Sequence, residues 1–128
     1  MGDDTAMTTV VLVLIALFFL AMGIAALVAP ATIIQPFGVI LSNADARAEV
    51  RAVYGGFGVF IAVLLGLTAT DVAGLRPGAI WAVAAALAGM AFGRLIARFV
   101  EKPTGFYPVW FYFWVELVAA GILVAVVA

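Results

Sequence analysis

The sequence predicts an all-α integral membrane protein, an antiparallel bundle of four transmembrane helices. Of its 128 residues, 68% are hydrophobic and only 10% are charged, whereas soluble domains are about half apolar and a quarter charged. The mean hydropathy is +1.31. Four separate runs are long enough to cross a bilayer, which takes about 20 apolar residues. We therefore expect the lipid bilayer to cover the apolar surface of this chain.

The four spans form a single membrane domain, residues 1–128. They are expected at about 7–29, 50–69, 79–100 and 108–128. Pro30 directly follows the first span and discourages its continuation. Ser42 and Asp45 resemble a capping box, so the second helix is expected to begin near Asn43. Pro77 suits the first turn of the third helix.

The three links between spans differ in length and character. The second (70–78) and the third (101–107) are short, which makes consecutive helices antiparallel neighbours. The first, "PATIIQPFGVILS" (30–42), is apolar but too short to span. Two interpretations are open for it: an interfacial segment with a one- or two-turn helix, or a lid folded over the mouth of the bundle.

The positive residues predict the orientation in the membrane. Four spans place both termini on one side, together with Arg76, while Arg47, Arg51, Arg98 and Lys102 lie on the other side. Lys and Arg favour the cytoplasmic side. We therefore predict that both termini are non-cytoplasmic.

This orientation can be tested with single cysteines, because the wild-type chain contains none and supplies a blank control. Thr5→Cys is expected to react with a membrane-impermeant thiol reagent in intact cells, and Thr104→Cys is expected to react only after the cells are opened. Labelling of Thr104→Cys but not of Thr5→Cys from outside would reverse the topology.

Several functional classes are disfavoured by what the chain lacks. It has no Cys and no His, and His is the commonest general base and metal ligand and a usual haem ligand. Its seven acidic residues mostly lie near the ends of segments, so we expect no metal site and no cofactor. The net charge of −1 does not suggest a nucleic-acid partner. No nucleophile–base pair or phosphate loop is evident, so we do not expect an enzyme.

Small residues indicate where the helices pack. The hydrophobic effect does not drive helix association within a bilayer, so close contact between helices depends on small side chains. Gly55 and Gly58 share a stripe of the second span, and Gly89 and Gly93 form a GxxxG motif in the third. Packing within the chain is the first interpretation, and a homodimer seam is the alternative, since the motif alone does not decide between them.

Aromatic residues cluster at the start of the fourth span. Tyr107, Trp110 and Tyr112 fit an aromatic belt at the level of the lipid headgroups. Alternatively, Trp110 and Trp114, which share a helix face, form an aromatic wall around a ligand.

Arg94 is the charge that most needs a partner, because a central Arg costs about 2.5–3.5 kcal/mol to insert. Intramembrane charges usually face inward and pair. Arg94 precedes Thr104, near the centre of the third link, by ten residues, and Glu116 follows it by twelve. Similar distances from a turn give similar depths on antiparallel helices. We therefore expect Arg94 and Glu116 to lie within about 4 Å of each other.

Two residues of the second span are expected to join this pair. Arg51 shares a stripe with Tyr54 and with the glycines of that span, which directs it inward. The expected cluster is thus Arg51, Tyr54, Arg94 and Glu116. Three interpretations are open: an ion-pair latch that sets the helix register, a ligand or proton site, and a contact to lipid headgroups.

The stretches "AEVRAVYGGFGVF" and "GRLIARF" resemble the bacterial membrane family called domain of unknown function 4345. So do Pro30 at the end of the first span, Pro103 in the third link and Glu116 in the last span. The resemblance covers nearly the whole chain. It implies four helices in a bacterial membrane, which we take to be the inner membrane. It also includes the charged residues of the expected cluster, Arg51, Arg94 and Glu116. It implies no activity.

The expected function follows from these features. We expect a small accessory or scaffold subunit that packs against a membrane-protein partner, or against further copies of itself, through small-residue and aromatic faces. The alternative is a binder or transporter of a small anionic or amphipathic molecule, or of a lipid, at the Arg/Glu cluster.

Overall fold

The computed structural model describes residues 2–102 and 105–127, which form helices joined by short links and contain no strand. The predicted all-α fold is confirmed. Thr104, the position for labelling the third link, lies outside the described residues, as does Pro103.

Four helical spans are long enough and apolar enough to cross a membrane, as predicted. They are Asp4–Val28, Ala44–Ala69, Arg76–Val100 and Phe106–Val127. The first lies in α1 (Gly2–Val28) and the third is α5 (Arg76–Val100). The second comprises α3 (Ala44–Val50), a π-helical turn η2 (Arg51–Gly56) and α4 (Phe57–Ala69). The fourth comprises a π-helical turn η4 (Phe106–Trp110) and α6 (Phe111–Val127).

The second helix begins at Ala44, next to the predicted start near Asn43, so its helical residues extend ahead of the predicted span (50–69). Its cap is Asn43 rather than Ser42, because the Asn43 side chain accepts a hydrogen bond from the backbone N–H of Ala46 at 2.8 Å. Such a cap satisfies one of the free donors of the first turn. The third helix begins at Arg76 with Pro77 in its first turn, as predicted.

The first link is partly helical. It contains α2 (Pro30–Ile34) and a 3₁₀ turn η1 (Gln35–Phe37). Gly38 ends this turn with a φ of 76°, which favours glycine. The second link contains a 3₁₀ turn, η3 (Val72–Gly74).

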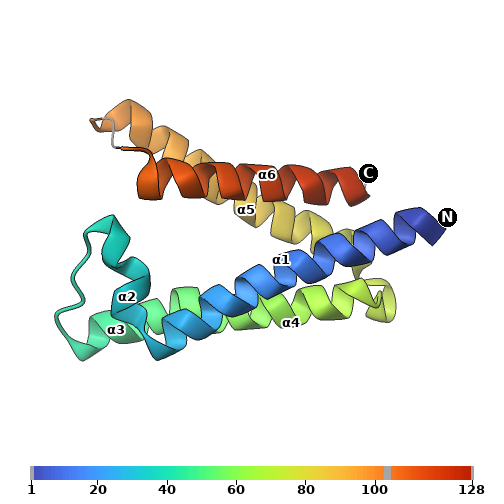
Figure 1. Cartoon of the computed structure of the whole chain (residues 1–128), viewed down its shortest axis with the longest axis horizontal. Helices are drawn as coiled ribbons and strands as arrows, with labels where there is room; N and C mark the ends of the chain where they lie inside the picture. The colour runs from blue at the N-terminus through green and yellow to red at the C-terminus, as the bar shows by residue number, and fades with distance from the viewer. Residues whose placement is uncertain (1, 103–104, 128) are drawn as a thin grey trace.

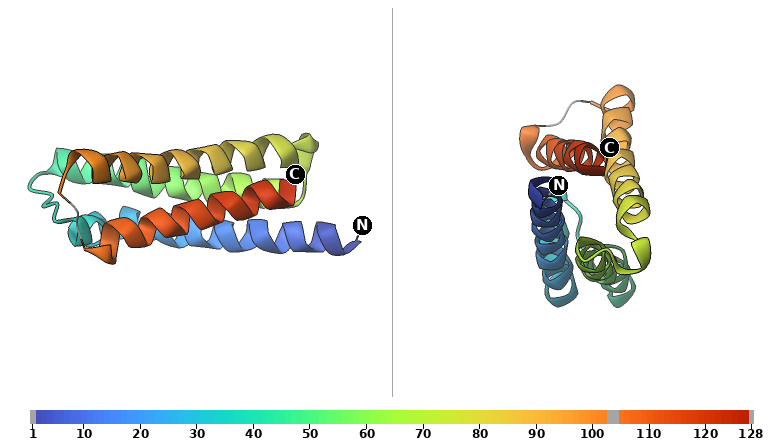
Figure 2. Two further views of the ribbon diagram at one scale, coloured as in Figure 1. Left: turned by 90° about the horizontal axis from the view of Figure 1, so that it is seen from above. Right: turned by 90° about the vertical axis from the view of Figure 1, so that its right-hand side faces the viewer.

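The helices form two antiparallel pairs, α1 with α4 and α5 with α6. Seen end-on, the four helices follow one another around the bundle in the order α1, α4, α5, α6 (Figure 2). Both termini lie at one end, which we call the terminus end. The first and third links lie at the other, which we call the linker end. The two pairs diverge toward the linker end, where the first link extends from α1 toward the start of α6 (Figure 1).

A shared hydrophobic core joins the two pairs. Every long helix contributes to it: Leu12, Phe19, Ala62, Leu65, Ala69, Ile80, Val83, Ala84, Leu87, Ala120 and Leu123. Leu12, Leu65, Ile80 and Leu123 are fully buried. The core lies toward the terminus end, so contacts between the pairs at the linker end come from other residues.

Glycines allow α1 and α4 to approach each other closely. A Cβ added at Gly23 would lie 2.6 Å from the backbone N of Val59, and one added at Gly58 would lie 3.0 Å from the Gly23 Cα. A Cβ added at Gly55 would lie 2.7 Å from Cδ2 of the Leu27 side chain. The predicted stripe of Gly55 and Gly58 is therefore a packing surface within the chain.

The other predicted glycine pair behaves differently. A Cβ added at Gly89 or Gly93 would meet no atom within 4 Å, and both residues are exposed. The buried residues of α5 lie on another face: Ala79, Ile80, Val83, Ala84, Leu87 and Ala91. Packing within the chain was the wrong interpretation for Gly89 and Gly93, because larger side chains mediate the internal contacts of α5.

Candidate functional site

An ion pair joins α5 to α6 near the linker end. Nε of Arg94 donates to Oε1 of Glu116 at 2.8 Å, and Nη2 donates to Oε2 at 3.0 Å. The pair is thus the two-point contact that a guanidinium makes best with a carboxylate. The Glu116 side chain is only 8% exposed, and that of Arg94 is 23% exposed. The equal-depth argument correctly brought these two residues together.

Two aromatic rings cover the guanidinium of Arg94. Its Cζ lies 5.7 Å from the ring centroid of Phe37 and 5.8 Å from that of Tyr112, near the limit for a cation–π contact. The two rings lie 5.8 Å apart. Phe37 belongs to η1 in the first link and Tyr112 to α6. The first link therefore folds back over the ion pair, which favours the lid interpretation for its Phe37 end.

The contact of Phe37 also connects the two helix pairs. The first link follows α1, whereas Arg94 and Tyr112 belong to the α5/α6 pair. The helix pairs diverge at this end (Figure 1), so Phe37 bridges them where the hydrophobic core does not. Phe37 was not expected at this site, and Tyr112 was expected in the headgroup belt. An aromatic residue between Pro36 and Gly38, in a link too short to span, was the available signal.

Arg51 and Tyr54 do not join the ion pair, contrary to the prediction. Nε of Arg51 donates instead to the backbone carbonyl of Leu27 at 2.9 Å, in the last turn of α1. A cation is favourable there because the last carbonyls of a helix have no helical partner. Tyr54 is 41% exposed. The reason is that the glycine stripe shared by these residues faces α1 rather than α5 and α6.

Trp110 and Trp114 both contact the ring of Phe113, edge-on, at centroid distances of 5.1 and 5.2 Å. Trp114 is 52% exposed, and Trp110 is half-buried. An outward, half-exposed indole is typical of the membrane interface. This arrangement favours the belt over the ligand-wall interpretation.

The arrangement of Arg94 and Glu116 can hold α5 and α6 in one register. Both carboxylate oxygens of Glu116 and two nitrogens of Arg94 are used in the pair. The opposite charges compensate each other where neither could easily remain alone. A ligand would have to displace one partner or add to the exposed side of Arg94.

A family model described as "Domain of unknown function (DUF4345)" matches residues 7–127. Comparison with curated proteins and with solved structures gives no match.

Proposed function

The chain belongs to the DUF4345 family, and from that premise we propose that it is a scaffold subunit of a bacterial inner membrane. Its binding face is the outer face of α5, and the helix that this face accepts is α5 of a second copy. The stripe of Gly89 and Gly93 carries this proposal, because it is exposed and open.

The contrast between the two glycine stripes supports this function. Gly23, Gly55 and Gly58 are in tight contact within the chain, whereas a Cβ added at Gly89 or Gly93 would meet no atom of the rest of the chain within 4 Å. A glycine within a helix is unfavourable by about 0.5–1 kcal/mol relative to alanine. A close approach by another helix would compensate for that disadvantage, as small-xxx-small stripes do in membranes.

A groove beside the stripe extends this face. It has a volume of about 430 Å³ and lies between α5 and α6. It is lined by Trp81, Ala84, Ala85, Ala88, Leu117, Ala120, Gly121 and Val124. Ala85 belongs to both surfaces, since it precedes Gly89 by one four-residue step. A second copy is the simplest occupant, because a small-residue stripe is complementary to itself across a two-fold axis.

Disulfide cross-linking in membranes tests this proposal directly. Ala85→Cys and Gly89→Cys are expected to form covalent dimers on mild oxidation, because helices in contact through small residues bring their Cβ atoms within disulfide reach. Phe60→Cys, on the exposed face of α4, is the matched control and should remain monomeric. Equal cross-linking at Phe60 and at the two α5 positions would overturn the proposal.

A second measurement uses bulky residues. Gly89→Leu combined with Gly93→Leu should weaken the dimer in mild detergent by about tenfold or more, equivalent to about 1.4 kcal/mol. Gly66→Leu is the control, since Gly66 is also exposed and open but lies on α4. A double variant that dimerises as well as the wild type would contradict the assigned face.

One observation favours a second candidate function, the binding of a small anionic or amphipathic molecule at Arg94. Its side chain remains partly exposed beside the Phe37 and Tyr112 rings. A mutant cycle of Arg94 and Glu116 distinguishes this role from that of a latch.

A further inference from the structure

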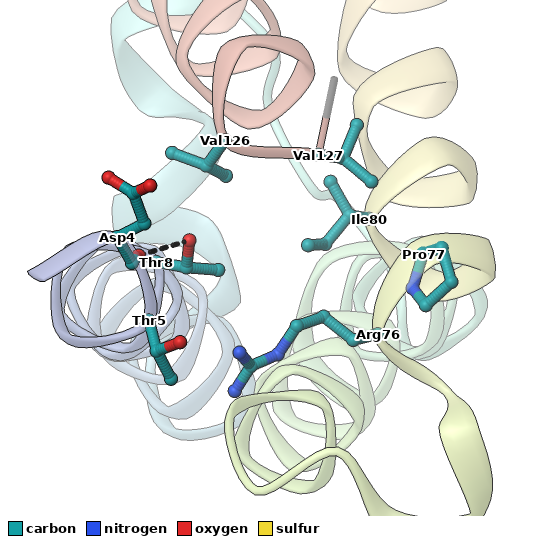
Figure 3. Close-up of a pocket in the computed structure, with 8 residues that line it drawn as sticks. All are labelled: Asp4, Thr5, Thr8, Arg76, Pro77, Ile80, Val126 and Val127. Carbon is teal, nitrogen blue, oxygen red and sulfur yellow. Dashed lines mark hydrogen bonds between the residues drawn. The ribbon is translucent and has the colours of Figure 1, made fainter. Parts of the chain in front are cut away.

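The terminus end contains a cavity with both polar and apolar lining residues. It is separate from the Arg94–Glu116 ion pair and from the glycine stripe of α5. Its volume is about 270 Å³. The lining side chains come from α1, α5 and α6: Asp4, Thr5, Thr8, Arg76, Pro77, Ile80, Val126 and Val127. Figure 3 shows them around the cavity, with the Arg76 side chain extending from the start of α5 toward α1.

Arg76 is held rigidly at the edge of this cavity. Its Nε donates to the carbonyl of Thr68 at 3.3 Å, and its Nη2 donates to that of Ala69, both in the last turn of α4. Its backbone N–H donates to Oδ1 of Asp71 at 2.9 Å. A guanidinium has five N–H donors, so these side-chain bonds leave donors for a further acceptor.

The opposite wall offers acceptors. Asp4 is exposed, and Thr8, one turn further along α1, is only 8% exposed. The Thr8 hydroxyl donates to the Asp4 carbonyl at 2.9 Å, and its oxygen can still accept a hydrogen bond. In Figure 3 the Asp4 carboxylate and the Arg76 guanidinium lie on either side of the two threonines.

The two charges share the cavity without pairing. Asp4 and Arg76 form no contact within the 4.0 Å of an ion pair, in contrast to Arg94 and Glu116. A cavity with one fixed cation and one separate carboxylate is complementary to a zwitterion. The anionic end should be a phosphate, since arginine recognises phosphate well. The cationic end should be an ammonium whose N–H groups can bond to carboxylate and hydroxyl oxygens.

The position and size of the cavity limit the ligand further. It lies at the ends of membrane-spanning helices, which is the level of the lipid headgroups. Ile80, Val126 and Val127 give it an apolar side. Its volume is slightly below the range for drug-sized ligands, so a headgroup fits better than a whole metabolite.

We propose that this cavity binds a phosphoethanolamine group. Arg76 contacts the phosphate, and Asp4 with Thr8 accepts hydrogen bonds from the ammonium. A phosphatidylethanolamine lipid and free O-phosphoethanolamine share this chemistry. This site was not expected from the sequence, although Asp4 and Thr8 are spaced to share one face of α1.

Native mass spectrometry of the protein with short-chain lipids tests this assignment. The wild type is expected to retain phosphatidylethanolamine about tenfold more than phosphatidylcholine, whose methylated ammonium cannot donate hydrogen bonds, or phosphatidylglycerol, which has no ammonium. Asp4→Asn should abolish this preference. Asp45→Asn, an exposed acid at the linker end, should retain it.

Two further measurements complete the test. One checks that the variant is folded, and the other determines whether the phosphoethanolamine group belongs to a lipid or to a soluble molecule. Asp4→Asn alters an exposed side chain, so its thermal unfolding in detergent should match that of the wild type. Displacement of the lipid by millimolar O-phosphoethanolamine would assign the soluble ligand, and lipid retention unaffected by it would assign the lipid. Equal binding of the three lipids by the wild type, or an unchanged preference in Asp4→Asn, would overturn the proposal.

Discussion

Glu116→Leu is expected to lower the free energy of unfolding by about 3–5 kcal/mol, because it leaves Arg94 inside the bundle without its carboxylate. The loss should fall toward the lower end of that range, since the Arg94 side chain is 23% exposed. Thermal unfolding in mild detergent measures the change. Glu49→Leu, at an exposed acid of α3, is the control and should change stability little.

The double variant Arg94→Leu/Glu116→Leu should recover much of this loss. Replacing a buried ion pair by apolar residues is often nearly neutral, whereas removing one partner is not. A double variant no more stable than the worse single variant would show that the two charges are uncoupled. The latch interpretation would then fail.

The same double variant separates a latch from a ligand site. If the pair only holds α5 against α6, the stable double variant should complement a knockout of the gene. A double variant that folds as well as the wild type but does not complement would favour the ligand-binding function over the scaffold. In that case the charges of Arg94 and Glu116 would be required for the function of the protein but not for its folding.

Gly23→Ala is the second substitution expected to be strongly destabilising. Its new Cβ would lie 2.6 Å from the Val59 backbone N and 2.8 Å from the Gly55 carbonyl oxygen. Backbone atoms cannot rotate away as a side chain can, so α1 and α4 must move apart. Overpacking of this kind typically costs about 1–3 kcal/mol, and we expect a loss near the upper end in thermal unfolding.

Gly66→Ala gives the matched comparison, and the expected sign is reversed. A Cβ at Gly66 would meet nothing within 4 Å, so the substitution adds no clash. Alanine is favoured over glycine in a helix by about 0.5–1 kcal/mol, and Gly66→Ala should stabilise by up to that amount. If Gly23→Ala were as stable as Gly66→Ala, the close approach of α1 and α4 would be contradicted.

The depth of a side chain in the membrane could be predicted by counting residues along the sequence, because the rise per helical residue is constant. Counting from the third link therefore brought Arg94 and Glu116 together without any knowledge of the fold. The number of spans followed in the same way, since each needs a fixed length of apolar residues. Proline and polar capping residues located the helix ends to within a few positions, including the start of the second helix at Ala44.

The direction in which each helix face points could not be predicted in this way, because it depends on which helices become neighbours. Gly55 and Gly58 were correctly expected to pack, but only the fold shows that α1 is their partner, and this directs Arg51 to the Leu27 carbonyl. Likewise, the spacing of Gly89 and Gly93 also places them on one helix face, yet that face points outward. Phe37 over Arg94, and Arg76 facing Thr8, join residues from distant segments, and only the tertiary packing of the four helices brings them together.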